Sequence, residues 1–290
     1  MYKSIAEILN ICEKESIPFW ECVQREDCAE QAMSPEENFE KMKKMYLAMR
    51  AADQSYDPDL LSQSGMSGRD GAKIAAARQE DRLLCGDFIG LVMEKAVQMG
   101  ESNACMKRIV AAPTAGSCGV LPAVLLSLQE QKNFDDDRMT EALYVAAGIG
   151  GVIASRAFLA GAAGGCQAEI GSASSMAAGA AAYLNGGDNK TIAHAAALAM
   201  KNLLGLACDP VAGLVEVPCV KRNVIGAVNA LTSADLACAG IESRIPVDEV
   251  YDAMRSIGRS LPENIRETGL GGLAGTPTGV ALREKLTALS

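Results

Sequence analysis

The chain has 290 residues, of which 49% are hydrophobic, so it is long enough to bury a substantial core. Its net charge of -9, without a long basic run, argues against nucleic acid or an anionic membrane as a partner, and 4% aromatic residues offer little surface for base stacking. The N-terminus has no apolar signal core followed by a small-residue cleavage site, so we expect a soluble cytoplasmic protein.

Residues 1–52 are expected to form helical segments. The run Ser34-Pro35-Glu36-Glu37 predicts a helix start, with a capping serine, a proline at the first position and then acids. An apolar stripe at helical spacing follows, expected in the core or at a subunit contact: Met42, Met45, Tyr46 and Met49. Residues 53–73 are rich in glycine, serine and aspartate, which predicts a surface connection or a substrate loop. A helix over 74–100 should follow.

The uncharged run 109–129 is long enough to suggest a membrane span, but its two prolines and a PTAGSCG turn predict a loop that enters a buried helix. Three aspartates at 135–137 suit the N-terminal end of the next helix. The body of that helix is almost wholly apolar, which predicts burial. A ridge of small residues should let a neighbouring helix pack closely against it: Ala147, Gly151 and Ser155.

Helical patterns continue to Leu184, from about Lys190 to Leu206, over about 222–241, and from 245 to about 258. The tail, residues 259–290, is rich in glycine. No set of alternating strands is recognisable. The sequence therefore predicts an all-α protein, with residues 1–290 forming a single catalytic domain.

Ten cysteines stand in a chain without a secretion signal, so structural disulfides are not expected. Cys166, Cys208 and Cys219 each lie where a helical pattern stops at glycine or proline. Loops at helix ends expose the N–H donors that an anionic cluster needs. No C-x-x-C pair or nearby fourth ligand is present, which excludes the common closed zinc motifs. Three thiolates leave two alternatives: a [4Fe–4S] cluster with one open iron, or buried free thiols.

The other cysteines are expected to pack in the interior, except for Cys118, which lies in the PTAGSCG turn and is a candidate pocket residue. The packed set is Cys12, Cys22, Cys28, Cys85, Cys105 and Cys238. The only histidine, His194, lies in an alanine-rich helix, and a structural role is favoured over that of a catalytic base.

Two cofactor motifs can be weighed and set aside. Residues 269–274 match G-x-G-x-x-G/A, but no strand precedes them, and Thr276-Pro277-Thr278-Gly279 is expected to break any helix start, so dinucleotide binding is rejected. A pyridoxal phosphate enzyme needs a Schiff-base lysine, for which Lys73 is the nearest and a weak candidate.

Four stretches, in this order, closely resemble the α chain of the iron–sulfur-dependent bacterial L-serine dehydratase: SGMSGRDGAK, APTAGSCGVLPAVL, GGCQAEIGSASSMAAG and LLGLACDPVAGLVEVPCVKRN. The resemblance runs from about residue 60 to the glycine-rich tail. It implies a mostly helical catalytic domain with a [4Fe–4S] cluster on Cys166, Cys208 and Cys219. It also implies conversion of L-serine to pyruvate and ammonia without pyridoxal phosphate, in amino-acid degradation and gluconeogenesis. The open iron would bind the substrate hydroxyl as a Lewis acid while a base removes the α-proton.

The resemblance also implies substrate contacts, for which turn and cap chemistry is the alternative. Pocket walls are expected at Ser64, Ser67, Gly68, Thr114 and Ser117. Arg222 and Asn223, just after the third cysteine, are expected to pair with the substrate carboxylate or to support the cluster. Glu169 lies three residues from Cys166, and it is expected either to support a cluster ligand or cap a helix, or to act in catalysis.

Single-chain relatives carry an S-S-S-H-T-type loop that supplies a histidine, and this chain has none. We therefore expect a separate β chain to provide the base in a heterodimer. No cysteine follows Cys238, so water or another ligand is expected at the open iron.

Two alternative functions remain. A cluster-dependent cysteine desulfidase would release sulfide instead of water, and a cluster-free helical scaffold would be colourless and indifferent to cysteine replacement.

Overall fold

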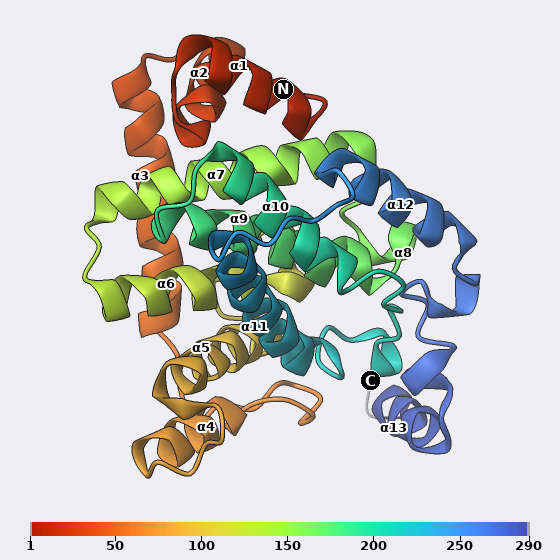
Figure 1. Cartoon of the computed structure of the whole chain (residues 1–290). Coiled ribbons are helices and arrows are strands. Elements are labelled where there is room, and N and C mark those ends of the chain that lie inside the picture. Colours follow the sequence, from red (N-terminus) through yellow and green to blue (C-terminus); the bar gives the residue numbers. More distant parts are fainter. Residues whose placement is uncertain (1, 289–290) are drawn as a thin grey trace.

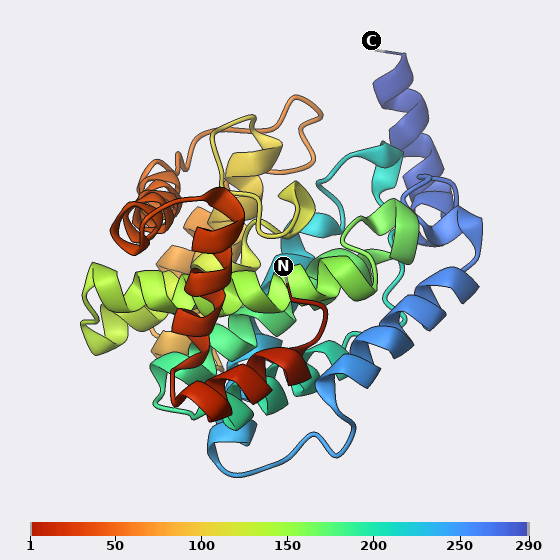
Figure 2. The ribbon, with the colours of Figure 1, turned by 90° about the horizontal axis from the view of Figure 1, so that it is seen from above.

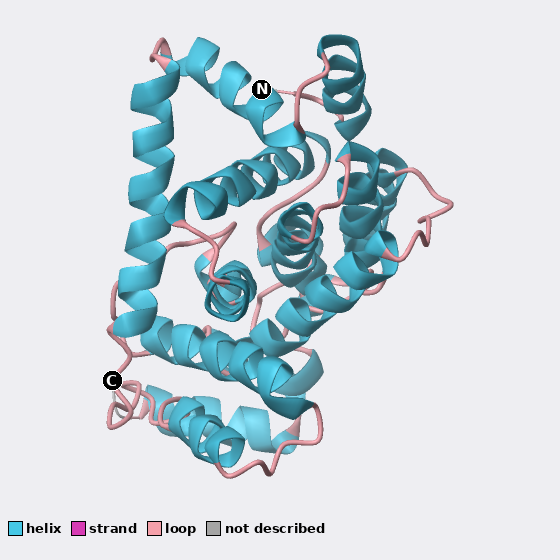
Figure 3. Ribbon diagram, turned by 60° about the vertical axis from the view of Figure 1, so that its left-hand side comes forward, coloured by secondary structure: helices cyan, strands magenta, loops and turns pink. Residues whose placement is uncertain are grey.

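The structure is a computed structural model that describes residues 2–288. Within that range it contains helices and no strand, which confirms the all-α prediction (Figures 1 and 3). The helices are α1 Ile5–Glu15, α2 Phe19–Gln31, α3 Pro35–Gln54, α4 Asp70–Gln79, α5 Gly86–Ala104, α6 Val120–Lys132, α7 Asp136–Arg156, α8 Gly161–Gly164, α9 Ser172–Leu184, α10 Asn189–Lys201, α11 Cys219–Cys238, α12 Val247–Ser260 and α13 Pro277–Thr287. Shorter turns are η1 Ala115–Ser117, η2 Gln167–Gly171, η3 Val211–Gly213, η4 Glu263–Ile265 and η5 Gly272–Gly275.

Helix α9 forms the centre of the molecule, and every one of its residues is buried. Helices α6, α7, α10 and α11 pack around it (Figure 1). Its run of alanine, serine and glycine allows these neighbours to approach closely. A Cβ atom at Gly179, for example, would stand 2.2 Å from Cδ1 of Ile149 on α7. The small side chains of α9 thus let its neighbours pack closely against it at the centre of the molecule.

The predicted start of α3 is confirmed, because Ser34 and Glu37 form a reciprocal capping box and Pro35 is the first helical residue. Of the methionine stripe on this helix, Met49 is buried and Met45 is half exposed.

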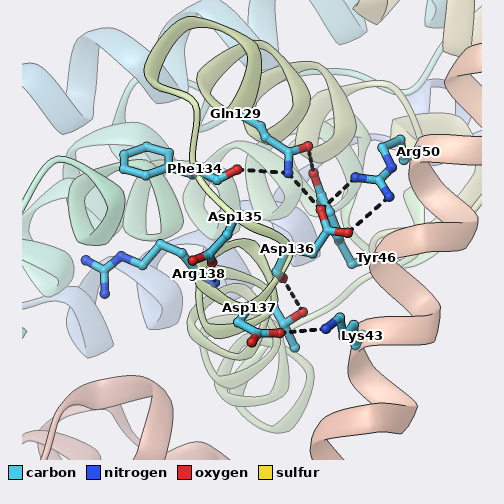
Figure 4. A network of polar contacts seen from close by, with 10 residues as sticks. Lys43, Tyr46, Arg50, Gln129, Phe134, Asp135, Asp136, Asp137 and Arg138 are labelled. Carbon is cyan, nitrogen blue, oxygen red and sulfur yellow. Dashed lines mark hydrogen bonds and ion pairs between the residues drawn. The ribbon is translucent and has the colours of Figure 1, made fainter.

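Figure 4 shows how α3 is fixed to the α6–α7 connection. Arg50 donates to both carboxylate oxygens of Asp136 at 2.6 and 3.1 Å, and Lys43 pairs with Asp137 at 2.7 Å. Gln129 of α6 donates to Asp136 at 3.0 Å and bonds the hydroxyl of Tyr46. This network joins the N-terminal helices to the central bundle.

Two predictions about long helices are wrong. The helix expected over 74–100 is broken between α4 and α5, where Asp81 and Gly86 adopt positive φ angles of 52° and 72° and the chain turns back. The helix α7 is not buried throughout, since Ala147 and Ser155 of its small-residue ridge are exposed. Its close neighbour α2 meets Gly148 instead, where a Cβ would stand 2.4 Å from Cγ2 of Val23.

The tail and two other predictions also need correction. The segment Thr276–Gly279 starts helix α13 rather than breaking it, because Thr276 accepts a hydrogen bond from the Gly279 N–H and proline takes the first position. The helix expected to reach Leu206 ends at Lys201. Cys85 is exposed at the start of α5 and not packed. In the part of the chain that the structure describes, no helix combines the length and apolarity needed to cross a membrane.

Candidate functional site

Three segments from different parts of the chain bring Cys166, Cys208 and Cys219 to one buried region. Cys166 stands directly before the π-helical turn η2, which runs into α9. Cys208 lies in the loop after α10, and its backbone bonds to Ile265 and Glu267 at 2.9 and 2.7 Å. Cys219 is the first residue of α11. Their exposed fractions are 3%, 3% and 8%, so all three thiols are withdrawn from solvent.

The three thiols influence one another electrostatically. Burial raises the pKa of Cys166 to about 11 and that of Cys219 to about 12, and the charge of Cys166 adds to the second shift. The pKa of Cys208 is raised further, by burial first and then by the charges of Cys166, Glu169 and the other neighbours. Without a metal the thiols are therefore protonated at neutral pH. Among the described residues, no group of three or more His, Cys, Asp or Glu side chains is arranged around a single metal ion.

Glu169 lies on η2 between the cysteines and the loop that precedes α6. Its carboxylate accepts a hydrogen bond from the Thr114 hydroxyl at 2.8 Å, and its other oxygen is 3.8 Å from Sγ of Cys208. Glycines crowd it: a Cβ at Gly116 or Gly161 would stand 3.2 or 2.9 Å from its oxygens. Burial raises the pKa of Glu169 above the ordinary value for a glutamate. Glu169 is three residues from Cys166 in the sequence, and its side chain contacts Cys208.

Arg222 and Asn223, one turn into α11, hold the cysteine-bearing segments to their neighbours. Arg222 donates to the Ala207 carbonyl at 2.7 Å and pairs with Asp209 at 2.9 Å. Its positive charge also opposes the rise of the pKa of the Cys166 thiol.

Asn223 connects α11 to the loop before α6. Its amide donates to the carbonyls of Gly116 and Cys219 at 3.0 Å each, and its oxygen accepts from the Gly119 N–H at 2.9 Å. Ser117 is fully buried beside this loop and shares a hydroxyl–hydroxyl contact of 3.2 Å with Thr114. Thr114, Ser117 and Asn223 therefore belong to the same neighbourhood as the cysteines.

The loop with the remaining expected pocket residues surrounds a carboxylate of the protein itself. Ser62 and Ser64 both donate to Glu216, at 2.6 Å and at 2.8–2.9 Å. Ser67 is buried beside them, and Gly68 has a φ of +125° and no room for a Cβ. The sequence analysis did not single out Glu216. Its position three residues before Cys219 is the one signal in the sequence that could have identified it.

Three other candidate residues from the sequence make contacts of a different kind. His194 accepts a hydrogen bond from the Ser243 N–H at 3.3 Å, as expected for a structural histidine. Lys73 is exposed and pairs with Asp70 at 2.7 Å. Cys118 is fully buried against the Met99 carbonyl.

The glycine motif at residues 269–274 packs against the cysteine-bearing loop. The Leu273 N–H donates to Asp209 at 2.8 Å, and a Cβ at Gly272 would stand 2.4 Å from the same carboxylate. The absence of a side chain at Gly272 therefore allows a close approach of the backbone to Asp209.

Comparison with known proteins identifies the family. The sequence model described as "Serine dehydratase alpha chain" matches residues 14–274. The chain belongs to the serine dehydratase α-chain family. It is 45% identical over 286 residues to the "Probable L-serine dehydratase, alpha chain" of Bacillus subtilis, with 99% of this chain and 95% of the relative covered. It is 41% identical to the "L-serine dehydratase, alpha chain" of Peptoniphilus asaccharolyticus, with 98% and 97% covered.

Some members of the serine dehydratase family are longer. The "L-serine dehydratase" of Helicobacter pylori is 41% identical over 200 residues, which are 68% of this chain but 43% of that relative. In such proteins the region similar to this α chain is joined to further sequence of comparable length.

Proposed function

We propose that the chain is the cluster-bearing α chain of an L-serine dehydratase, which eliminates water from L-serine to give pyruvate and ammonia. The observation that carries the proposal is the buried region shared by Cys166, Cys208 and Cys219 in a chain whose full-length relatives are named for this activity. Neighbouring hydroxyl, amide and carboxylate groups supply the polar surroundings that a small amino acid needs.

The donor set fits a [4Fe–4S] cluster with one iron free of cysteine. The three thiols are buried, and they come from three separate segments of the chain. Each thiol of such a cluster binds a different iron, so the sulfur atoms need not converge on one point. Arg222 beside Cys166 provides positive charge next to an anionic group. When bound, the cluster supplies a Lewis acid for the departing hydroxyl.

The residues of the chain itself would orient the substrate and exclude water. Thr114 and Glu169 form one polar surface next to Cys208, and Asn223 keeps the Thr114 loop and the start of α11 together. The burial of these groups strengthens their hydrogen bonds and keeps competing water away. Burial favours the protonated, neutral form of Glu169. A neutral carboxyl group would not repel an anionic cluster or the carboxylate of the substrate.

The base is proposed to come from a separate β chain. His194, the only histidine, is committed to a backbone N–H and lies outside the cysteine region. Three loops border that region: residues 56–69, residues 207–218 and the tail around η5, and they lie side by side in Figures 1 and 2. Exposed leucines occur on all three loops, with 37–64% of each residue accessible: Leu60, Leu61, Leu214, Leu270 and Leu273. This apolar border suits a partner chain that covers the site.

The test is activity of the purified chains under anaerobic conditions. We expect pyruvate from L-serine when the α and β chains are mixed, and far less from either alone. Cys219→Ser should abolish turnover, whereas Cys85→Ser, at an exposed thiol, should not. Faster release of sulfide from L-cysteine than of pyruvate from L-serine would replace the proposal with a desulfidase. Full turnover by the α chain alone would refute the role of the β chain.

A further inference from the structure

Among the residues that the structure describes, the buried carboxylate of Glu216 accepts its side-chain hydrogen bonds from two serine hydroxyls. The residue is 6% exposed, Ser62 donates to one oxygen at 2.6 Å, and Ser64 lies 2.8 and 2.9 Å from both. No lysine or arginine within the described residues forms an ion pair with it. A buried carboxylate without a cation is costly, so its position has to be stabilised by the hydrogen bonds it accepts.

These hydrogen bonds also organise the loop internally. The Ser62 hydroxyl that donates to Glu216 accepts from the Ser67 N–H at 3.2 Å, and the Ser64 hydroxyl accepts from the Met66 N–H at 3.0 Å. A backbone pair, the Ser62 N–H to the Ser67 carbonyl at 2.8 Å, closes the same turn. We call residues 62–68 the serine loop. The hydroxyls of Ser62 and Ser64 each accept a hydrogen bond from a backbone N–H of this loop and donate one to the Glu216 carboxylate.

The backbone of Glu216 belongs to the segment that carries two of the cysteines. Its carbonyl accepts the Val220 N–H at 3.0 Å and so forms part of the first turn of α11, directly around Cys219. Its N–H donates to the Leu214 carbonyl at 2.7 Å within the loop that leads back to Cys208. One side chain thus bridges the serine loop and the cysteine-bearing segment, which are about 150 residues apart in sequence.

We propose that Glu216 is a positioning residue that joins the serine loop to the first turn of α11, so that the loop and Cys219 are placed together. The inference rests on the proposed function in one respect, namely that the serine loop borders the L-serine pocket. The mechanical claim stands on the hydrogen bonds. Without the carboxylate, the donors of Ser62 and Ser64 lose their acceptor, and the loop detaches from α11.

Limited proteolysis of the full α chain tests the connection without activity. We expect Glu216→Ala to be cut within residues 56–69 at least about tenfold faster than wild type. In wild type the loop must break two charge-assisted hydrogen bonds before it opens, whereas the variant lacks both, so its loop should open at least that much more often. Ser62→Ala/Ser64→Ala should give the same cutting rate, and adding Glu216→Ala to it should change little, since both remove one connection. Additive effects, or a wild-type cutting rate in Glu216→Ala, would overturn the proposal.

A matched control is Asp53→Ala, which removes a partly buried carboxylate that pairs with Lys95 at 2.9 Å and forms no hydrogen bond with the serine loop. It should lower thermal stability and leave cutting within 56–69 unchanged. If Asp53→Ala opens the loop as much as Glu216→Ala does, general destabilisation explains the result and the proposal fails. Where Glu216→Ala does not fold, Glu216→Gln, which keeps one acceptor oxygen, should give an intermediate rate.

Kinetics of the αβ enzyme supply the second readout. A displaced pocket loop should raise the KM for L-serine about tenfold or more in Glu216→Ala, with a smaller change in kcat. An unchanged KM beside rapid loop cutting would show that the serine loop does not border the substrate, and would overturn that part of the inference. If wild type has no serine activity, the proposed function fails, and the proteolysis result decides the mechanical claim by itself.

Discussion

Gly161 offers the sharpest perturbation of the cysteine region, because it leaves no room for a side chain. A Cβ at this position would stand 2.6 Å from Sγ of Cys208 and 2.9 Å from an oxygen of Glu169. Both distances are shorter than van der Waals contact. Gly161→Ala must therefore displace Cys208, Glu169 or the short helix α8, and each of these movements disturbs the same site.

The energetic cost of Gly161→Ala can be bounded. Overpacking of a dense interior costs about 1–3 kcal/mol, while alanine favours a helix over glycine by about 1 kcal/mol. The free energy of unfolding should therefore fall by no more than about 2 kcal/mol, a shift of a few degrees in the unfolding temperature. Gly179→Ala is the matched control, since its Cβ would stand 2.2 Å from Cδ1 of Ile149 in α7, away from the cysteines.

The assay combines thermal unfolding with iron bound after anaerobic reconstitution. Both variants should unfold slightly earlier than wild type, and only Gly161→Ala should lose most of its iron and its serine turnover. If Gly161→Ala binds iron as wild type does, or if Gly179→Ala loses iron equally, the geometry assigned to the cysteine region is wrong.

Three further outcomes follow from single contacts. Arg50 holds the pKa of Asp136 below its ordinary value, so Asp136→Asn should cost about 1 kcal/mol at pH 7 and progressively less as the pH falls below about 4, by urea unfolding. Burial raises the pKa of Glu169 in the folded protein above its value in the unfolded chain. At a pH above the unfolded value, the need to keep or bury this charge therefore lowers the free energy of unfolding. Metal-free Glu169→Gln, with the Thr114 bond kept, should therefore be more stable than wild type at pH 8 and lose that advantage in acid. His194→Gln should retain serine turnover, and its abolition would contradict a structural role.

The parts of the fold that were predictable from sequence are those fixed by local chemistry. The start of α3 follows from Ser34, Pro35 and Glu37, which satisfy the first N–H groups of the helix within four residues. The start of α7 follows in the same way from Asp135, whose carboxylate accepts the Arg138 N–H. Such signals need no knowledge of the neighbouring elements.

The failures depend on tertiary contacts. The break between α4 and α5 interrupts a helical pattern at Asp81, which adopts a left-handed conformation, and the two helices then pack against each other. The exposed side of α7 could not be inferred, since its alanines and glycines suit burial and exposure equally. Thr276-Pro277 reads as a turn or a helix start, and only the cap on the Gly279 N–H distinguishes them.

For the candidate site, residue types and motif order located the cysteine-bearing segments, but not the pairing of side chains within them. Glu169, which contacts Cys208, lies in a π-helical turn, a local geometry that the sequence pattern does not predict. The capture of Ser62 and Ser64 by Glu216 joins positions about 150 residues apart, which one sequence cannot reveal.

The measurement that tests the central claim most directly is the content of iron and acid-labile sulfide, on protein purified without oxygen. Wild type and Cys85→Ser should each hold about four of both per chain, and Cys208→Ser should lose most of them. Absence of both elements from wild type after anaerobic reconstitution, or equal amounts in Cys208→Ser, would contradict the cluster assignment and leave the three cysteines as packing residues.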